Sequence, residues 1–160
     1  MRKVLEDAMA AVSVLVERPE VDTNAVAALG HSYGGNTTLF LTALDERVRF
    51  ACTSGALASY RRKMADGTGI EMAEVIPGFS ARFDLEHVLG AIAPRQLLVV
   101  SGTEDKYAAD ADELIEMARP AFGSASSALE HLRAHGGHAL DQERFQCIID
   151  WMVDTAASAR

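Results

Sequence analysis

Residues 25–35 of this 160-residue chain read Ala25-Val26-Ala27-Ala28-Leu29-Gly30-His31-Ser32-Tyr33-Gly34-Gly35. The first five residues are apolar without alternation, which is typical of a strand that a parallel sheet buries on both faces. The glycine-rich segment predicts a tight turn, and the apolar residues around Leu39 and Leu44 predict a helix after it. The pattern Gly-x-Ser-x-Gly thus lies between a strand and a helix, the context in which it marks a nucleophilic serine.

Helices and strands alternate along the rest of the chain. Apolar positions at helical spacing predict helices over residues 4–16, 85–92, 110–119 and 141–156. Short apolar runs predict further strands at residues 48–52, 96–100 and 129–133. This order predicts a three-layer α/β fold with a mainly parallel sheet, in a single domain over residues 1–160. The irregular, glycine-rich segment 55–83 is predicted to be a cap-like excursion that forms one pocket wall.

The charge balance restricts the partners. Asp and Glu number 23 against 15 Lys and Arg, so the formal net charge is −8. Nucleic-acid binding needs clustered basic residues, so we expect no nucleic-acid partner. The chain has 2 cysteines, too few for a disulfide framework or, unaided, for a zinc site.

The sequence shows no signal for a membrane or for secretion. No stretch approaches the roughly 20 apolar residues that a membrane-spanning helix needs. The first residues, Met1-Arg2-Lys3-Val4-Leu5-Glu6-Asp7, are interrupted by acidic side chains and do not form the apolar core of a signal peptide. We therefore expect a cytoplasmic protein without a membrane partner.

A nucleophilic serine needs a base and a carboxylate that orients the base. The strand at residues 96–100 runs into Ser101-Gly102-Thr103-Glu104-Asp105. Asp105 would therefore lie at the same edge of the sheet as Ser32, because the carboxyl ends of parallel strands meet there. Glu104 is the alternative acid.

The base is expected from the loop that follows the last predicted strand. This loop reads Ala134-His135-Gly136-Gly137-His138-Ala139-Leu140, and glycines precede His138. Such a loop can carry an imidazole back over the edge of the sheet. We expect His138 to be the base, with His135 as its competitor. The remaining histidines are less suited, His31 because it lies in the turn and His131 because it lies within a strand.

The candidates occur in the order Ser32, Asp105, His138, and with the motifs around them they resemble the carboxyl-terminal half of an α/β-hydrolase. The chain is most similar to the dienelactone hydrolase and acetyl xylan esterase group. The motifs that carry this resemblance are Gly30-His31-Ser32-Tyr33-Gly34-Gly35, Ile92-Ala93-Pro94-Arg95, Ser101-Gly102-Thr103-Glu104-Asp105 and Gly136-Gly137-His138. Ser-Tyr-Gly-Gly also occurs in prolyl-oligopeptidase-type peptidases, so the subgroup stays open.

The resemblance implies an esterase that acts on a small-molecule ester through a Ser32–His138–Asp105 triad, with no metal or organic cofactor. Gly30, His31 and Gly34 belong to the nucleophile elbow, where Gly30 and Gly34 would avoid collisions with neighbouring backbone. The backbone N–H of Tyr33, at the start of a helix, is the expected oxyanion donor. A peptidase or thioesterase with the same triad is an alternative, and so is a non-catalytic binding module.

The resemblance covers only the last four of the eight family strands, so the chain resembles a truncated α/β-hydrolase fold. The family loop that supplies the second oxyanion N–H has no counterpart here. The side chain of His31 or Tyr33, or a second subunit, is a possible source of that donor. The strand at 25–29 would also have a free edge, and exposed apolar edges promote association. We therefore expect a homodimer or higher oligomer that covers this edge.

Overall fold

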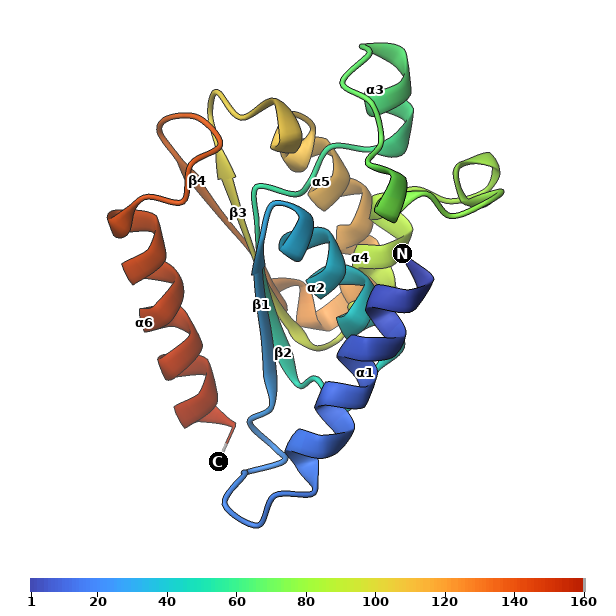
Figure 1. Ribbon diagram of the computed structural model, residues 1–160. Helices are drawn as coiled ribbons and strands as arrows, with labels where there is room; N and C mark the ends of the chain where they lie inside the picture. Colours follow the sequence, from blue (N-terminus) through green and yellow to red (C-terminus); the bar gives the residue numbers. More distant parts are fainter. Residues whose placement is uncertain (160) are drawn as a thin grey trace.

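The computed structural model describes residues 1–159 and consists of a parallel β-sheet between two layers of helices (Figure 1). The strands lie in the sheet in the order of the sequence, and each pairs in parallel with the next. They are β1 (Ala27–His31), β2 (Phe50–Ser54), β3 (Gln96–Gly102) and β4 (Leu129–Ala134). The predicted three-layer α/β class is confirmed.

The connecting helices lie on one face of the sheet. Crossovers between parallel strands are right-handed, so a sheet whose order follows the sequence places every connection on the same side. The helices of this layer are α1 (Arg2–Val16), α2 (Tyr33–Leu44), α4 (Leu85–Ile92) and α5 (Ala111–Phe122). Helix α6 (Gln142–Ser158) follows the last strand and covers the opposite face. None of the helices within residues 1–159 is long and apolar enough to cross a membrane.

The two layers enclose two apolar cores of unequal size. The larger core lies between the sheet and α1, α2, α4 and α5. The smaller core lies under α6, with Cys52, Leu98, Val100 and Ile148 at its centre. Strand β2 is buried along its whole length because it has a strand on each side and a helical layer on each face. This position explains why Phe50, Ala51 and Cys52 are apolar without alternation.

Two strands begin two residues later than the sequence pattern predicts. Strand β1 starts at Ala27, which lies opposite Phe50 at the start of β2. The residues before each strand belong to hydrogen-bonded turns, since Ala25 N–H donates to the Asp22 carbonyl and Val48 N–H donates to the Asp45 carbonyl. Local turns thus take up the first residues of both apolar runs.

Helix α5 extends beyond its predicted end. Pro120 lies within the helix, which continues to Phe122. A proline removes one backbone N–H, so in the last turn it leaves only the carbonyl of Glu116 without its helical partner. Glu116 is exposed, and solvent can satisfy this carbonyl. The predicted end at Arg119 was therefore wrong.

Two buried carboxylates anchor the excursion at residues 55–83. Asp84 is 0% exposed, and its carboxylate accepts hydrogen bonds from the N–H groups of Tyr60, Arg61 and Leu85. Asp110 accepts from both the N–H and the hydroxyl of Ser59. The excursion contains the short helix α3 (Tyr60–Ala65) and the 3₁₀ turns η1 (Met72–Glu74) and η2 (Phe79–Ala81). Its position therefore depends on buried hydrogen bonds at its base.

We predict that Asp84→Ala lowers the free energy of unfolding by about 3 kcal/mol, because three donors would lose a buried acceptor. Urea unfolding measures the effect. The control is Asp66→Ala, which removes an exposed turn carboxylate that accepts from Thr68 N–H and should cost about 1 kcal/mol or less. Equal losses for the two variants would contradict the anchoring role.

Candidate active site

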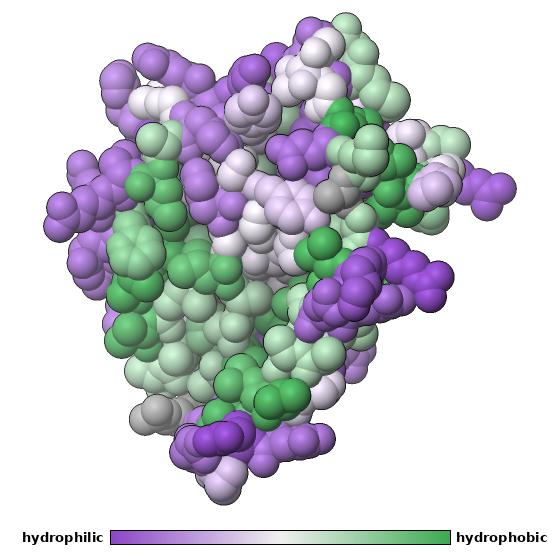
Figure 2. Space-filling model, in the orientation of Figure 1, coloured by the Kyte–Doolittle hydropathy of each residue, from purple (hydrophilic) through white to green (hydrophobic). Residues whose placement is uncertain are grey.

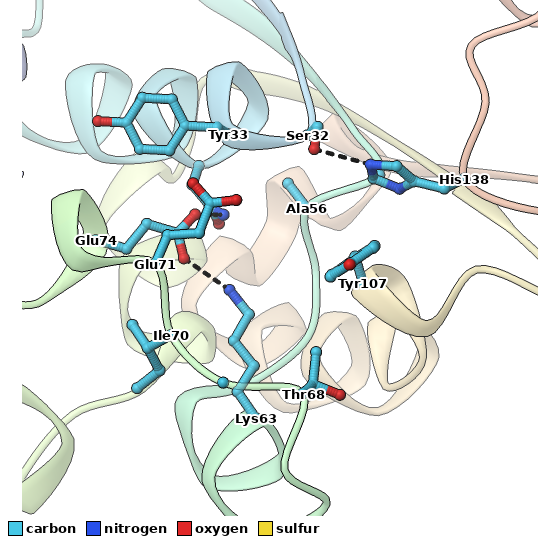
Figure 3. Close-up of a pocket in the computed structure, with 13 residues that line it drawn as sticks. Ser32, Tyr33, Ala56, Lys63, Thr68, Ile70, Glu71, Glu74, Tyr107 and His138 are labelled. Atoms are coloured by element: carbon cyan, nitrogen blue, oxygen red, sulfur yellow. Dashed lines mark hydrogen bonds and ion pairs between the residues drawn. The ribbon is translucent and has the colours of Figure 1, made fainter.

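The structure brings Ser32, Asp105 and His138 into one hydrogen-bonded chain at the carboxyl edge of the sheet. They follow β1, β3 and β4 respectively, and the carboxyl ends of parallel strands share this edge. His138 Nε2 lies 2.8 Å from Ser32 Oγ (Figure 3). His138 Nδ1 lies 2.9 Å from Asp105 Oδ2 and 3.1 Å from Oδ1. The imidazole thus lies within proton-transfer distance of both the hydroxyl and the carboxylate.

Ser32 occupies a strained backbone position. Its φ of 56° is the only positive φ of a non-glycine residue among residues 1–159. Residues in such regions cost about 1–3 kcal/mol and tend to occur at functional sites. The Ser32 N–H donates to the Ser54 carbonyl at 2.8 Å, which ties the turn to the end of β2. This conformation places the serine between the last residue of β1 and the first residue of α2.

Of the two glycines expected to avoid a backbone collision near Ser32, one does so and the other does not. A Cβ on Gly30 would lie 2.1 Å from the Gly34 carbonyl oxygen, so Gly30 is required by close backbone contact. The expectation for Gly34 was wrong, because a Cβ there would meet nothing within 4 Å. The crowded position is Gly35, where a Cβ would lie 2.7 Å from Ala56 Cβ and 2.8 Å from the Ser54 carbonyl oxygen. The second contact on the turn comes from the next strand, which local sequence does not reveal.

Asp105 is buried and held in place by backbone. Its side chain is 1% exposed, and Oδ1 accepts a hydrogen bond from Tyr107 N–H at 2.9 Å. The alternative acid Glu104 is exposed and contributes only its backbone N–H, to the Gly136 carbonyl. The alternative base His135 is also exposed. The geometry therefore favours Asp105 over Glu104 and His138 over His135.

The His138 ring lies against two other aromatic rings. The centroid of Tyr107 is 4.7 Å from that of His138, and the centroid of His31 is 4.9 Å from it. His31 Nδ1 lies 3.0 Å from Ser54 Oγ, which fixes the ring of His31 in turn. These contacts restrict rotation of the imidazole. The sequence did not point to Tyr107 or Ser54. Tyr107 acts through its contact with the His138 ring and Ser54 acts through His31, and both partners are distant in the sequence.

The Tyr33 side chain does not offer a second oxyanion donor. Figure 3 shows its ring pointing away from the Ser32 hydroxyl. Its own hydroxyl is buried and has no hydrogen-bond partner in the described part of the chain. The Tyr33 backbone N–H, in contrast, begins helix α2 directly after Ser32, at the positive end of the helix dipole.

A cavity of about 360 Å³ opens beside Ser32 and His138. Helix α2 lines one side of it and the excursion lines another, through Lys63, Thr68, Ile70 and Glu71 among others (Figure 3). The excursion thus forms one wall of the cavity, as we expected from its irregular, glycine-rich sequence. Ligand pockets commonly measure about 300–1,000 Å³, so this cavity suits a small group.

A buried ion pair joins the cavity wall to helix α2. Lys63 Nζ lies 2.9 Å from Glu74 Oε2, and both side chains are nearly inaccessible. Glu74 Oε1 also accepts a hydrogen bond from the amide of Asn36, one turn after Ser32. The excursion is therefore fixed relative to the serine. No sequence motif marks Asn36 and Glu74, because these two residues lie 38 residues apart in the sequence.

A second Ser–His–Asp chain lies outside the cavity. Ser101 Oγ is 2.7 Å from His131 Nε2, and His131 Nδ1 is 3.2 Å from Asp112 Oδ1. Ser101 is only 3% exposed and does not line the cavity, so a substrate cannot reach its hydroxyl. The hydrogen-bonded order Ser–His–Asp alone therefore does not identify the proposed nucleophile.

Among residues 1–159 there is no cluster of three or more His, Cys, Asp or Glu side chains placed to hold a metal ion.

Comparison with known sequences gives one family. The profile of the prolyl oligopeptidase family matches residues 2–147. Comparison with curated protein sequences gave no match.

Solved structures with similar folds include two esterases and a peptidase. The glucuronoyl esterase from Solibacter usitatus has a TM-score of 0.76 and 18% identity, over 94% of this chain and 47% of that chain. Acetyl xylan esterase 1 from Thermoanaerobacterium sp. JW/SL YS485 has a TM-score of 0.65 and 19% identity, over 94% and 52%. Dipeptidyl peptidase 4 from Porphyromonas gingivalis has a TM-score of 0.66 and 17% identity, over 94% and 22%. The present chain thus spans about half the length of the glucuronoyl esterase, and the likeness at these identities is one of fold.

We predict that the protein becomes less stable as the pH falls from about 7 to about 5. Burial lowers the pKa of His31, and the neighbouring His138 lowers it further. Burial also lowers the pKa of His131, with Arg119 adding to the shift. In the unfolded chain both imidazoles have a pKa of about 6.5. Below that pH the unfolded state therefore binds more protons than the folded state, and the free energy of unfolding decreases.

Urea unfolding across this pH range tests the prediction. His131→Gln should flatten the dependence, because one of the two titrating groups is removed. The exposed His135 supplies a control, and His135→Gln should leave the dependence unchanged. If the free energy of unfolding of His131→Gln depends on pH as steeply as that of the wild type, the prediction for His131 is wrong.

Proposed function

Since this chain belongs to the prolyl oligopeptidase family, we propose that it is a serine hydrolase that cleaves small carboxylic esters through an acyl-enzyme. The observation that supports this most directly is the hydrogen-bonded chain Ser32–His138–Asp105 at the mouth of a cavity. Resemblance to α/β-hydrolases and similarity to two esterase structures support the same reaction class.

The proposed reaction begins with proton transfer to His138. The Asp105 carboxylate accepts a hydrogen bond from Nδ1–H, so Nε2 presents its lone pair to the Ser32 hydroxyl. Ser32 Oγ attacks the ester carbonyl carbon while its proton passes to Nε2. The tetrahedral intermediate then expels the alcohol, which takes that proton. Water attacks the acyl-enzyme with His138 again as base, and the proton returns to Ser32 as the acid leaves.

The Tyr33 backbone N–H is the proposed oxyanion donor. It follows Ser32 directly and lies at the amino end of α2, where the helix dipole favours negative charge. Loss of one oxyanion donor can cost about 100- to 1,000-fold in turnover.

Short acyl esters are the proposed substrates. The cavity of about 360 Å³ is closed on one side by the Lys63–Glu74 ion pair, which leaves no apolar channel for a long chain in that direction. Matched nitrophenyl esters of increasing chain length test this proposal. We expect kcat/KM to be highest for acetate or propionate and to fall for octanoate.

Peptide hydrolysis is the second candidate function, favoured by the family match and by the similarity to a dipeptidyl peptidase. The same three side chains can act on esters, thioesters and amides, so they do not distinguish these substrates. Turnover of an ester, a thioester and an anilide with the same acyl group separates these activities. Anilide hydrolysis that Ser32→Ala abolishes would favour the peptidase, and its absence beside ester hydrolysis would favour the esterase.

We predict that a fluorophosphonate probe labels the wild-type protein and not Ser32→Ala. The matched control is Ser101→Ala, which removes the serine of the buried second chain and should leave labelling intact. Asp105→Asn should lower kcat on the order of 1,000- to 10,000-fold, because the imidazole loses the carboxylate that orients it. Labelling of Ser32→Ala at the wild-type rate, or its absence in the wild type, would refute the proposal.

We also propose that the protein forms a homodimer through the free edge of β1. Within residues 1–159, strand β1 pairs with β2 alone, and Leu29 on it is 39% exposed. Figure 2 shows apolar surface on this side, where β1 lies beside α6 in the orientation of Figure 1. Pairing of β1 with its copy across a two-fold axis would satisfy the free backbone groups and bury this surface.

We predict a dimer in size-exclusion chromatography with light scattering, and a monomer for Leu29→Lys, whose charge would oppose association. Leu44 is the control because it is 60% exposed at the far end of α2, away from this edge. Leu44→Lys should remain dimeric. A wild-type protein that stays monomeric at high micromolar concentration would rule the dimer out.

A further inference from the structure

Arg144 occupies an unusual position for a basic residue. It is the third residue of α6 after the N-cap Asp141, in the turn where the helix dipole disfavours positive charge. The residue is also only 6% exposed. A buried charge at such a site is costly unless its hydrogen-bond donors are satisfied. Neither helix formation nor solubility accounts for an arginine here.

The two terminal nitrogens of the guanidinium group donate to the loop that carries His138, whereas Nε has no hydrogen-bond partner in the described part of the chain. One terminal nitrogen donates to the carbonyls of Gly137 and Ala139, at 2.7 and 2.9 Å. The other donates to the carbonyl of His135 at 2.7 Å. Arg144 Nε also lies 3.2 Å from Asp141 Oδ2 as an ion pair. The contacts therefore hold the backbone on both sides of His138.

The rest of the loop is held in a different way. Glu104 N–H donates to the Gly136 carbonyl, and Gly136 N–H donates to Thr103 Oγ1, so the loop is joined to the Asp105 loop as far as residue 136. In the described part of the chain no backbone N–H outside the helices and strands donates to the carbonyls of Gly137 or Ala139. Gly136 has a φ of 112°, and a Cβ there would lie 2.9 Å from the Arg144 guanidinium. The loop thus leaves room for the guanidinium.

We propose that Arg144 is a positioning residue that keeps His138 within hydrogen-bond distance of both Ser32 and Asp105. The inference rests on the proposed hydrolase function for its kinetic consequence. The rigid, planar fork of the guanidinium holds several carbonyls in fixed directions at once, whereas the three donors of a lysine ammonium rotate about a single nitrogen. Displacement of a catalytic group by about 1 Å can cost about 100-fold in rate.

Kinetics of Arg144→Met and Arg144→Lys test the proposal. We expect kcat on a short nitrophenyl ester to fall about 10- to 100-fold in Arg144→Met, with KM changed less than about threefold, because the cavity wall is untouched. The rate of fluorophosphonate labelling should fall by the same factor. Arg144→Lys should lie between Arg144→Met and the wild type, and added guanidinium ion at low millimolar concentration should raise the rate of Arg144→Met.

The control Ile148→Val separates positioning from stability. Ile148 lies in the same helix and is completely buried, so this variant loosens the packing of α6 while it keeps every hydrogen bond from Arg144 to the loop. It should lower the melting temperature and leave kcat at the wild-type value. Wild-type labelling by Arg144→Met, or an equal fall of kcat in Ile148→Val, would overturn the proposal.

Hydrogen exchange tests the same inference without activity. Amides in the segment 135–140 should exchange faster in Arg144→Met and Arg144→Lys than in the wild type or in Ile148→Val. Unchanged exchange there would overturn the role of Arg144. A wild-type protein that no probe labels, but whose loop loses protection in both Arg144 variants, would refute the proposed hydrolase and leave Arg144 as the group that holds this loop.

Discussion

Strands β1 to β4 run in one direction, and each pairs with the strand that follows it in the sequence. In such a sheet the loops after the strands all leave at one edge. Ser32, Asp105 and His138 each lie within four residues of a strand end. Their meeting is therefore a consequence of strand direction and pairing, and the cavity opens at the same edge for the same reason.

The two Ser–His–Asp chains show what else a reactive site needs. Ser32–His138–Asp105 and Ser101–His131–Asp112 have the same connectivity and similar distances. In the first, the serine lines a cavity and only the carboxylate is deeply buried. In the second, the serine is buried within β3 and the carboxylate is half exposed. Access to the hydroxyl, and the free N–H groups at the start of α2, distinguish the proposed nucleophile.

Buried charges position the loops around the proposed site. Asp84 and Asp110 fix the base of the excursion, Lys63 and Glu74 join it to α2, and Arg144 holds the loop of His138. Part of the excursion is also held by apolar burial, since Leu57 and Tyr60 belong to the larger core and Phe79 packs against it. Hydrogen bonds to buried charged groups add to this burial, and they fix direction as well as distance.

The sequence by itself determined the order of helices and strands and the parallel sheet, because apolar periodicity and strand ends are local properties. It also predicted Ser32, Asp105 and His138 as a catalytic triad, and that role stays a prediction. The sequence did not reveal that Gly35 rather than Gly34 is crowded, that helix α5 continues beyond Pro120, or that β1 and β2 each begin two residues later than their apolar runs. Each of these depends on a neighbour distant in the sequence or on solvent at a helix end. Tyr107, the Lys63–Glu74 pair and Arg144 likewise carry no motif. Only the tertiary structure decided their roles, since a hydrogen bond or ring contact between distant segments exists only once the sheet has brought those segments together.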